Sequence, residues 1–203
     1  MKYSCLLLAL LVFGTAPTIA QELLVNPGFE DLDSDGNFGD GWGSFGSAGF
    51  FSFFGPDNGH GSLFPDNIGN SGGFFQSGIA ATPGTEYDFV LANTRIEGDF
   101  DAEVFFGLEF YEADDATIIT QSFAMLADPG VEVNGGVFNH TATAPAGAAF
   151  VRPIALFDTV FSSGGQRNVF VFDASLTVVP EPASLGLLSV GGLALMTRRR
   201  HAG

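Results

Sequence analysis

The chain has 203 residues, in which 23 acidic residues stand against 7 lysines and arginines, and its formal net charge is −16 at pH 7. So acidic a surface repels nucleic acid, anionic lipid and, without bridging cations, acidic polysaccharide, and we therefore exclude nucleic acid as a partner. Hydrophobic residues make up 46% of the chain and 23 residues are phenylalanine, which predicts a packed core in spite of the 28 glycines.

Residues 1–20 are predicted to be a secretory signal peptide. Lys2 precedes nine apolar residues, 5–13, and small residues follow. A basic, an apolar and a small-residue region in this order is typical of an export signal, whereas a buried helix does not explain the basic residue at this terminal position. Cleavage after Ala20, or after Ala16, would remove Cys5, the single cysteine. We therefore expect an exported domain without a disulfide.

Residues 21–179 are predicted to form one all-β domain. Short runs of β-branched and aromatic residues alternate with turn residues, and no amphipathic helix interrupts them, which favours a β-sandwich. The segment 36–76 is rich in glycine and phenylalanine, and we expect it to be rich in loops. The predicted strands are 22–25, 49–54, 73–79, 86–93, 102–111, 117–123, 136–143, 148–157 and 168–178.

Several short motifs along this domain resemble the landmarks of jelly-roll carbohydrate-binding modules, the group that includes families four, nine and sixteen. The resemblance implies an all-β jelly-roll β-sandwich of about eight to nine antiparallel strands, and carbohydrate as the ligand class. The motifs are LVNPGFE at 24–30, Trp42, HGSL at 60–63, ATPGTEY at 81–87 and VFVFDASL at 169–176.

The same resemblance implies a structural calcium ion that ties the first strand to the last. The residues that match its ligands are Glu30 and Asp173. A hard cation takes six to eight oxygen ligands and offsets the repulsion between two carboxylates that lie close together. The alternative is that both residues are surface or capping acids.

A second candidate calcium loop begins at Asp31. The stretch 31–36 has acids at its first, third and fifth positions and glycine at its sixth, as an EF-hand loop does. Its twelfth position is Trp42, where an EF-hand needs a bidentate glutamate, so a true EF-hand is excluded. The two alternatives left are a weaker calcium loop that includes Asp40, and a solvated turn rich in Asp.

Sugar-binding modules usually stack a sugar ring on an exposed tryptophan or tyrosine. The exported domain has only Trp42, Tyr87 and Tyr111, and the first two lie at landmarks that are often core in the family. We therefore expect a concave face around Tyr111, on strands that neighbour one another. The predicted ligand-binding residues are Tyr111, Glu109, Asn93 and Arg95.

No motif of the exported domain indicates catalysis. Its histidines are His60 and His140, and no HExxH motif accompanies them. Acid pairs such as Asp114 and Asp115 arise by coincidence in so acidic a chain. We expect a protein that is not an enzyme.

The C-terminal segment combines three features in order. Pro180, Glu181 and Pro182 precede an apolar run, 183–197, and Arg198, Arg199 and Arg200 follow it. As a helix the run would be roughly 22 Å long, short of the ~30 Å hydrocarbon core. The arginines hold it in the membrane, because each costs about 2.5–3.5 kcal/mol at the bilayer centre. We predict a hydrophobic transmembrane helix at about 183–197.

This arrangement resembles the PEP-CTERM sorting signal of bacterial envelope proteins. The resemblance implies that a membrane-embedded exosortase cuts near the Pro-Glu-Pro motif and delivers the protein to the cell surface, commonly in bacteria that make exopolysaccharide. The two prolines, Glu181 and the three arginines would be features of a substrate. The alternative is a tail anchor that is never cut.

These features predict an exported, non-catalytic protein of the cell surface or extracellular matrix, with a structural or adhesive role linked to exopolysaccharide. The alternative function is a dedicated carbohydrate-binding protein with a defined sugar pocket. The expected partners are an exosortase, polysaccharide and, before processing, the membrane. The expected organisation is a signal peptide at 1–20, a galactose-binding-like sandwich at 21–179 and a sorting signal at 180–203.

Overall fold

The structure is a computed structural model of the chain and describes residues 20–52, 59–64, 70–97, 103–127, 133–158 and 168–180. Gln21–Val179 form one compact unit. Among the described residues no helix is long and apolar enough to span a membrane. Outside them lie residues 1–19 of the predicted signal peptide, the predicted helix 183–197, and Glu181, Pro182, Arg198, Arg199 and Arg200.

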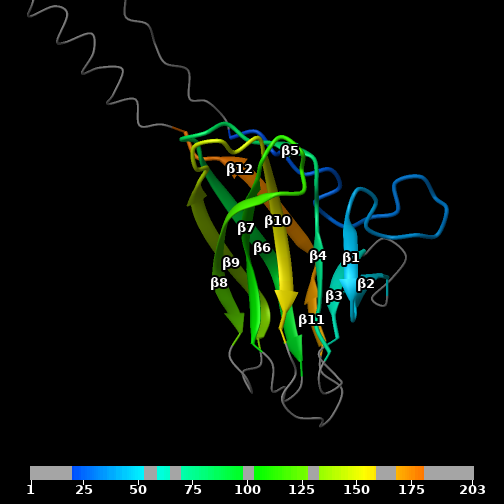
Figure 1. The fold of residues 1–203 in the computed structure, drawn as a ribbon. Coiled ribbons are helices and arrows are strands. Elements are labelled where there is room, and N and C mark those ends of the chain that lie inside the picture. The colour runs from blue at the N-terminus through cyan, green and yellow to red at the C-terminus, as the bar shows by residue number, and fades with distance from the viewer. Residues whose placement is uncertain are drawn as a thin grey trace, which may run out of the picture. The chain divides into compact units, whose positions relative to one another are not determined.

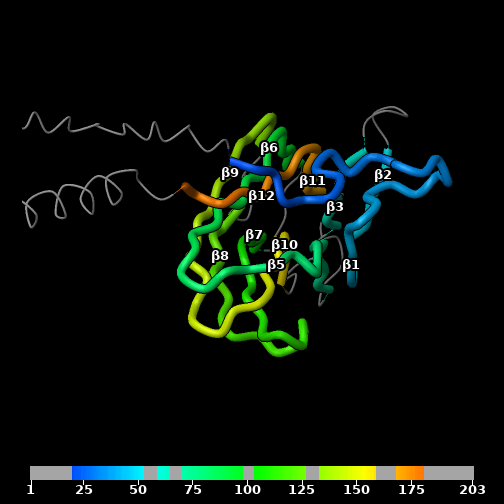
Figure 2. Tube along the Cα trace, turned by 90° about the horizontal axis from the view of Figure 1, so that it is seen from above, coloured from blue at the N-terminus to red at the C-terminus, as the bar shows by residue number. Residues whose placement is uncertain are grey.

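The described strands form two antiparallel sheets that pack face to face, and Figure 2 shows them as two layers. We name each sheet after a central strand. The β7 sheet has the order β1 (Gly43–Gly46), β4 (Gly72–Phe75), β10 (Phe150–Phe157), β7 (Val104–Tyr111) and β8 (Ile118–Ala127), with β5 (Ile79–Ala80) beside β10. The β6 sheet contains β2 (Ala48–Phe51), β3 (His60–Leu63), β11 (Asn168–Val171), β12 (Asp173–Val178), β6 (Glu86–Glu97) and β9 (Val133–Thr143).

In the β6 sheet, one edge of β6 pairs with β9, and its other edge pairs with β12 and then with β11. The predicted all-β sandwich is therefore confirmed (Figure 1). Several details differ from the prediction, among them two strands that were not predicted, β1 and β3. The segment 22–25 forms only a bridge between Glu22 and Thr177, 73–79 divides into β4 and β5, and 168–178 divides at Phe172 into β11 and β12.

The core lies between the two sheets and is largely aromatic. Tyr87, Phe89 and Leu91 alternate along β6 and are buried, while Phe106 and Phe110 face them from β7. The ring centroids of Phe89 and Phe106 are 6.1 Å apart, as are those of Tyr87 and Phe110. Alternation of this kind buries one face of a strand, and it made β6 predictable.

The opening motif folds into a tight turn against the sandwich. Asn26 Nδ2 donates to the carbonyl of Glu30, and the N–H of Glu30 donates to Asn26 Oδ1 at 2.8 Å. Trp42 Nε1 donates to the carbonyl of Asn26 at 2.9 Å, and the Trp42 ring lies 4.7 Å from that of Phe29, which is fully buried. Trp42 is therefore a packing residue that closes the loop between residues 30 and 42.

One open edge of the sandwich is closed by a side-chain contact. Ser122 on β8 and His140 on β9 belong to different sheets, and Ser122 Oγ lies 2.8 Å from His140 Nε2. The imidazole also packs edge-on against Phe106, with ring centroids 6.2 Å apart. Both side chains are half-buried between the layers, so this contact connects the two sheets.

Candidate functional site

The outer face of the β7 sheet is unusually apolar. A strand with one solvated face alternates apolar and polar residues, but β7 and β10 carry apolar residues on both faces, as doubly covered strands do. The strand register places one row of neighbours across the whole sheet. In order across the strands this row is Phe45, Gly73, Leu156, Phe105 and Met125.

A groove of about 450 Å³ follows this row. Its rim is accessible, because Phe45 is 42% exposed and Met125 is 44% exposed. Gly73 makes room for an aromatic ring, since a Cβ at this position would lie 2.7 Å from the ring of Phe45. The side chains that line the groove are those of Phe45, Ser71, Phe105, Phe123, Met125, Leu156, Phe157 and Asp158.

A polar cluster occupies the same face four residues further along β7 and β10. Tyr111 Oη donates to Glu109 Oε2 at 2.6 Å, and Arg152 Nη1 donates to Tyr111 Oη at 2.6 Å. Gln121 Nε2 donates to the other carboxylate oxygen of Glu109 at 2.6 Å. Arg152 also lies 3.9 Å from the carboxylates of both Glu109 and Asp115. The cluster therefore satisfies Glu109, whose side chain is only 7% exposed.

Tyr111 is part of this cluster and does not form an exposed platform. It is 3% exposed, and the guanidinium carbon of Arg152 lies 4.1 Å from its ring centroid. Burial, together with the hydrogen bond and the negative charge of Glu109, raises the pKa of Tyr111 well above its usual range. Its hydroxyl therefore stays protonated and acts as the donor to Glu109.

The structure does not bring the predicted ligand-binding residues together. Tyr111 and Glu109 lie on the β7 sheet, whereas Asn93 and Arg95 lie on β6 in the other sheet. Asn93 occupies an irregularity of β6 with φ of 52°, and its side-chain amide donates to Asp173. A site that combines Tyr111 with Asn93 and Arg95 is therefore not formed.

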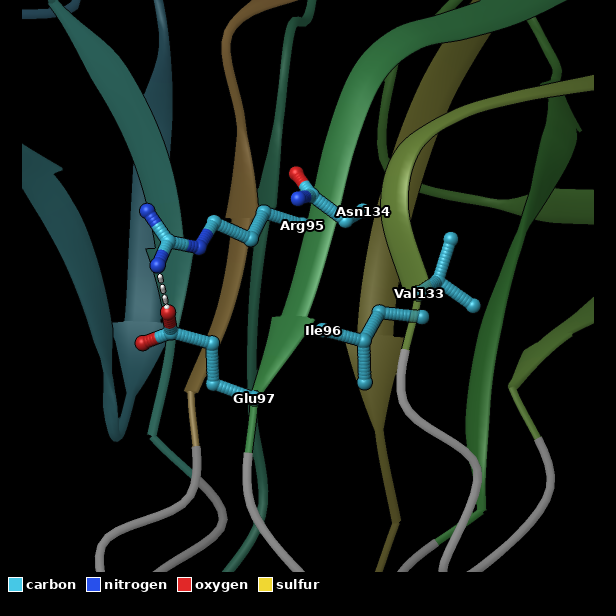
Figure 3. A pocket seen from close by; sticks show the side chains of 5 residues that line it. All are labelled: Arg95, Ile96, Glu97, Val133 and Asn134. Atoms are coloured by element: carbon cyan, nitrogen blue, oxygen red, sulfur yellow. Dashed lines mark ion pairs between the residues drawn. The ribbon is translucent and has the colours of Figure 1, made fainter.

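Arg95 instead lines a separate pocket of about 430 Å³ on the β6 sheet, shown in Figure 3. Its guanidinium makes an ion pair with Glu97, two residues along the same strand. Ile96, Val133 and Asn134 complete the lining, from β6 and β9. Because the charges of Arg95 and Glu97 neutralise one another, these two groups together give the pocket no net charge.

The loop from Asp31 to Asp40 gathers three carboxylates. Oxygen atoms of Asp31, Asp33 and Asp40 all lie within 4.8 Å of one another. The loop is ordered around them, because the N–H of Leu32 donates to Asp40 at 2.7 Å and the N–H of Gly36 donates to Asp31 at 2.9 Å. Such an oxygen-only donor set suits a hard divalent cation.

Electrostatic repulsion within this loop affects Asp33. The backbone N–H of Asp35 lowers the pKa of Asp33, but desolvation and the carboxylates of Asp35, Asp40 and Asp31 together outweigh it, and the pKa lies above the ordinary value of 3.8. A bound cation would relieve this repulsion.

The other predicted calcium residues lie on adjoining segments. The N–H of Ala174, next to Asp173, donates to the carbonyl of Pro27 at 2.8 Å, so the opening and closing motifs are neighbours. Glu30 and Asp173 are both exposed. Within the part of the chain that the structure describes, the metal-competent group of three acidic residues is the one in the loop, and neither Glu30 nor Asp173 belongs to it.

The groove residues were missed because sequence reasoning looked for tryptophan and tyrosine. A signal was present in the doubled phenylalanines, such as Phe105 and Phe106 on β7. One ring of such a pair must point into the core and the other away from it. Three strands of one sheet carry apolar residues at both odd and even positions, so both of their faces are apolar. This pattern indicates that the outer face of the sheet is apolar.

Comparison with known proteins concerns both the C-terminal segment and the sandwich domain. Residues 178–200 match the PEP-CTERM protein-sorting motif, which confirms the resemblance of this segment to that signal. No curated protein matches the chain at a significant level.

Solved structures share the fold at low sequence identity. The enzymatically active domain of Bacteriophage CBA120 tailspike protein 4 aligns with a TM-score of 0.52 and 10% identity, over 78% of this chain and 21% of that one. The present chain thus spans about a fifth of the tailspike chain. A Stig cyclase from Fischerella sp. TAU aligns with a TM-score of 0.51 and 14% identity, over 81% of this chain and 100% of the cyclase.

Carbohydrate-binding modules with a β-sandwich fold are the main group among the structural neighbours. One of them, TmCBM61 in complex with β-1,4-galactotriose, aligns with a TM-score of 0.48 and 14% identity, over 78% of this chain and 99% of the module. At these identities the similarities concern the β-sandwich alone.

Proposed function

We propose that the protein is exported, sorted through an exosortase and displayed at the cell surface or in the extracellular matrix. Its sandwich domain would have a structural or adhesive role linked to exopolysaccharide and no catalytic role. The observation that carries this proposal is the position of the sorting motif. β12 ends at Val178, the motif spans 178–200, and Pro180 is exposed. A processing enzyme can therefore cut the chain without unfolding the domain.

The predicted segments at both ends support the same route. A signal peptide at 1–20 would start export, and the apolar run 183–197 with Arg198, Arg199 and Arg200 would stop it. The protein would then be held in the membrane until the exosortase acts near Pro180, Glu181 and Pro182.

The test is the intact mass of the protein recovered from cells with and without a functional exosortase. With the enzyme we expect a chain that begins at Gln21 and ends near Pro182. Without it, or in a Glu181→Ala variant, the chain should keep its arginines and fractionate with membranes. Glu112→Ala, which changes an exposed acid of the domain, is the matched control. Recovery of extracellular protein that still carries Arg198–Arg200 would contradict the proposal.

A second candidate function is carbohydrate binding at a defined site. The observation that favours it is the groove of about 450 Å³ with Phe45, Phe105 and Phe123 in its walls. The C–H faces of sugar rings stack on aromatic side chains in a concave site of this size. We therefore propose the groove on the β7 sheet as the site of this alternative function, in place of the predicted set of Tyr111, Asn93 and Arg95.

Affinity-gel retardation by soluble polysaccharides tests this function. Phe45→Ala should lose retardation, because it removes the most exposed ring of the groove. Val137→Ala is the matched control, since Val137 lies on β9 of the other sheet and is 68% exposed. Equal retardation of both variants would place binding elsewhere, and no retardation by any polysaccharide would refute the function.

We also propose that calcium stabilises the domain near its opening motif. The two candidate sites are the carboxylates of Asp31, Asp33 and Asp40, and the predicted pair Glu30 and Asp173. The proximity of the three loop carboxylates supports the first, and the pairing of the opening and closing motifs supports the second. In either site the ion would be structural, because it would offset repulsion between carboxylates.

A further inference from the structure

The groove on the β7 sheet offers very little hydrogen bonding to a ligand. Of the side chains that line it, only those of Ser71 and Asp158 are polar, and the others are aromatic, aliphatic or methionine. The backbone groups beneath are engaged between β4, β10, β7 and β8 in the sheet ladder. A hydroxyl group that enters this groove therefore gives up water without a replacement partner, which disfavours binding.

Substituents that end in a methyl group, unlike hydroxyl groups, favour binding in such a groove. A buried methyl or methylene group favours binding by roughly fourfold, and an apolar pocket that fits it discriminates by tenfold or more. The apolar side chains of the lining, among them Phe45, Leu156, Phe105 and Met125, offer contact surface to such groups. The lining therefore selects the apolar parts of a sugar.

The charges on this face exclude an acidic ligand. Asp158 lies at the groove, and Arg152, the cation of this face among the described residues, is already bound to Tyr111 and close to Glu109 and Asp115. No described cation is left on this face for a carboxylate, and the chain as a whole has a net charge of −16. Charge complementarity thus favours a neutral occupant.

The length of the groove indicates a polymer. Its row of residues crosses five strands, from Phe45 on β1 to Met125 on β8. At a strand spacing of about 4.8 Å, four spacings give roughly 19 Å, which is longer than a single sugar ring.

We propose that the groove binds a neutral polysaccharide whose sugars carry methyl-ended groups, either O-acetyl esters or 6-deoxy positions. The inference deepens the proposed carbohydrate binding and rests on it. It goes beyond carbohydrate binding by naming the chemical group of the sugar that the groove recognises.

The first arm of the test uses O-acetylated xylan before and after mild alkaline deacetylation, which leaves the backbone unchanged. Calorimetry or affinity gels should show at least fivefold tighter binding of the acetylated form. Phe45→Ala and Met125→Ala should reduce this binding at least fivefold and reduce the preference, while Val137→Ala should keep both. A thermal melt of each variant shows whether the domain is folded.

The second arm compares methyl α-L-rhamnoside with methyl α-L-mannoside, which differ only in the hydroxyl at carbon 6, by NMR titration. A preference in either arm supports the proposal and identifies the substituent. Equal binding within both pairs would overturn the inference and leave carbohydrate binding standing. No binding to any of the four probes would overturn both. If Phe45→Ala instead changes the oligomeric state in light scattering without affecting glycan binding, the groove is an interface between copies and the proposal is wrong.

Discussion

The guanidinium carbon of Arg152 lies 4.1 Å from the ring centroid of Tyr111 and 5.0 Å from that of Phe75, on the outer face of the β7 sheet. The same guanidinium donates to the Tyr111 hydroxyl, which donates in turn to Glu109. One cation thus covers two rings and balances a carboxylate that has almost no access to solvent.

Removing the charged side chain of Arg152 should destabilise the fold. Arg152→Ala leaves Glu109 as an uncompensated, nearly buried charge, and we expect a loss of about 3–5 kcal/mol in the free energy of unfolding. Urea denaturation measures it. Arg95→Ala is the control, because Arg95 and Glu97 are 40% and 39% exposed and such a pair contributes less than about 1 kcal/mol. Equal losses in the two variants would show that the Arg152 cluster is not buried in solution.

Substitution of two glycines with positive φ distinguishes the cost of backbone strain from the cost of steric overlap. Gly46 and Gly84 have φ of 60° and 83°, a backbone conformation that favours glycine. A Cβ on Gly46 would lie 2.0 Å from the carbonyl oxygen of Ser71, whereas the space around Gly84 is open. We expect Gly84→Ala to cost about 1–2 kcal/mol. Gly46→Ala should cost at least about 2 kcal/mol more, because β1 must move away from β4. Chemical denaturation compares the two, and similar values would contradict the close approach of the strands.

The turn before β8 should respond to acid. The N–H and the hydroxyl of Thr117, with the N–H of Ala116, donate to the carboxylate of Asp114 and hold its pKa at about 2, below its ordinary value of 3.8. Because the folded-state pKa is the lower one, Asp114 stabilises the fold above about pH 4, and this contribution is lost as the pH falls towards 2. An NMR pH titration measures it, and Asp33, which should titrate above 3.8, is the internal reference. Titration of Asp114 near 3.8 would show that the turn is open.

Calcium should raise the melting temperature of the domain, and a chelator should lower it. Saturation at 100 times the dissociation constant would add about 2.7 kcal/mol to the free energy of unfolding. Asp33→Asn should abolish the response if the loop binds the ion, and Asp173→Asn should abolish it if the pair with Glu30 does. Asp88→Asn, at an acid of β6 outside both candidate sites, should leave it intact. A transition that is unchanged by chelator would contradict both sites.

The sandwich could be predicted from the sequence because β6 and β10 combine β-branched, aromatic and turn residues in a pattern that a helix does not satisfy. β1 and β3 could not, because glycine has low strand propensity and these strands exist through their pairing, β1 with β4 and β3 with β2 and β11. Local pattern also fails to assign the two sheets. Tyr111 and Arg95 both lie on long strands, and only the tertiary arrangement shows that they belong to different layers.

The candidate site was less predictable than the fold for a related reason. Phe45, Leu156, Phe105 and Met125 come from four separated strands, and the register that aligns them is fixed by long-range hydrogen bonds. By contrast, the carboxylates of Asp31 and Asp33 are close in sequence, and their proximity could be expected from spacing alone.

The pairing at the two ends of the domain has a mechanical consequence. Glu22 bridges Thr177, the N–H of Leu23 donates to the carbonyl of Leu176 at 2.9 Å, and β12 pairs with β6 over six residues, Asp173 to Val178. If a surface attachment pulls on the chain beyond Val178, tension runs along the axis of β12 and loads these six pairs in shear, all at once rather than one after another. A tether at that point would strain the strongest direction of the sheet.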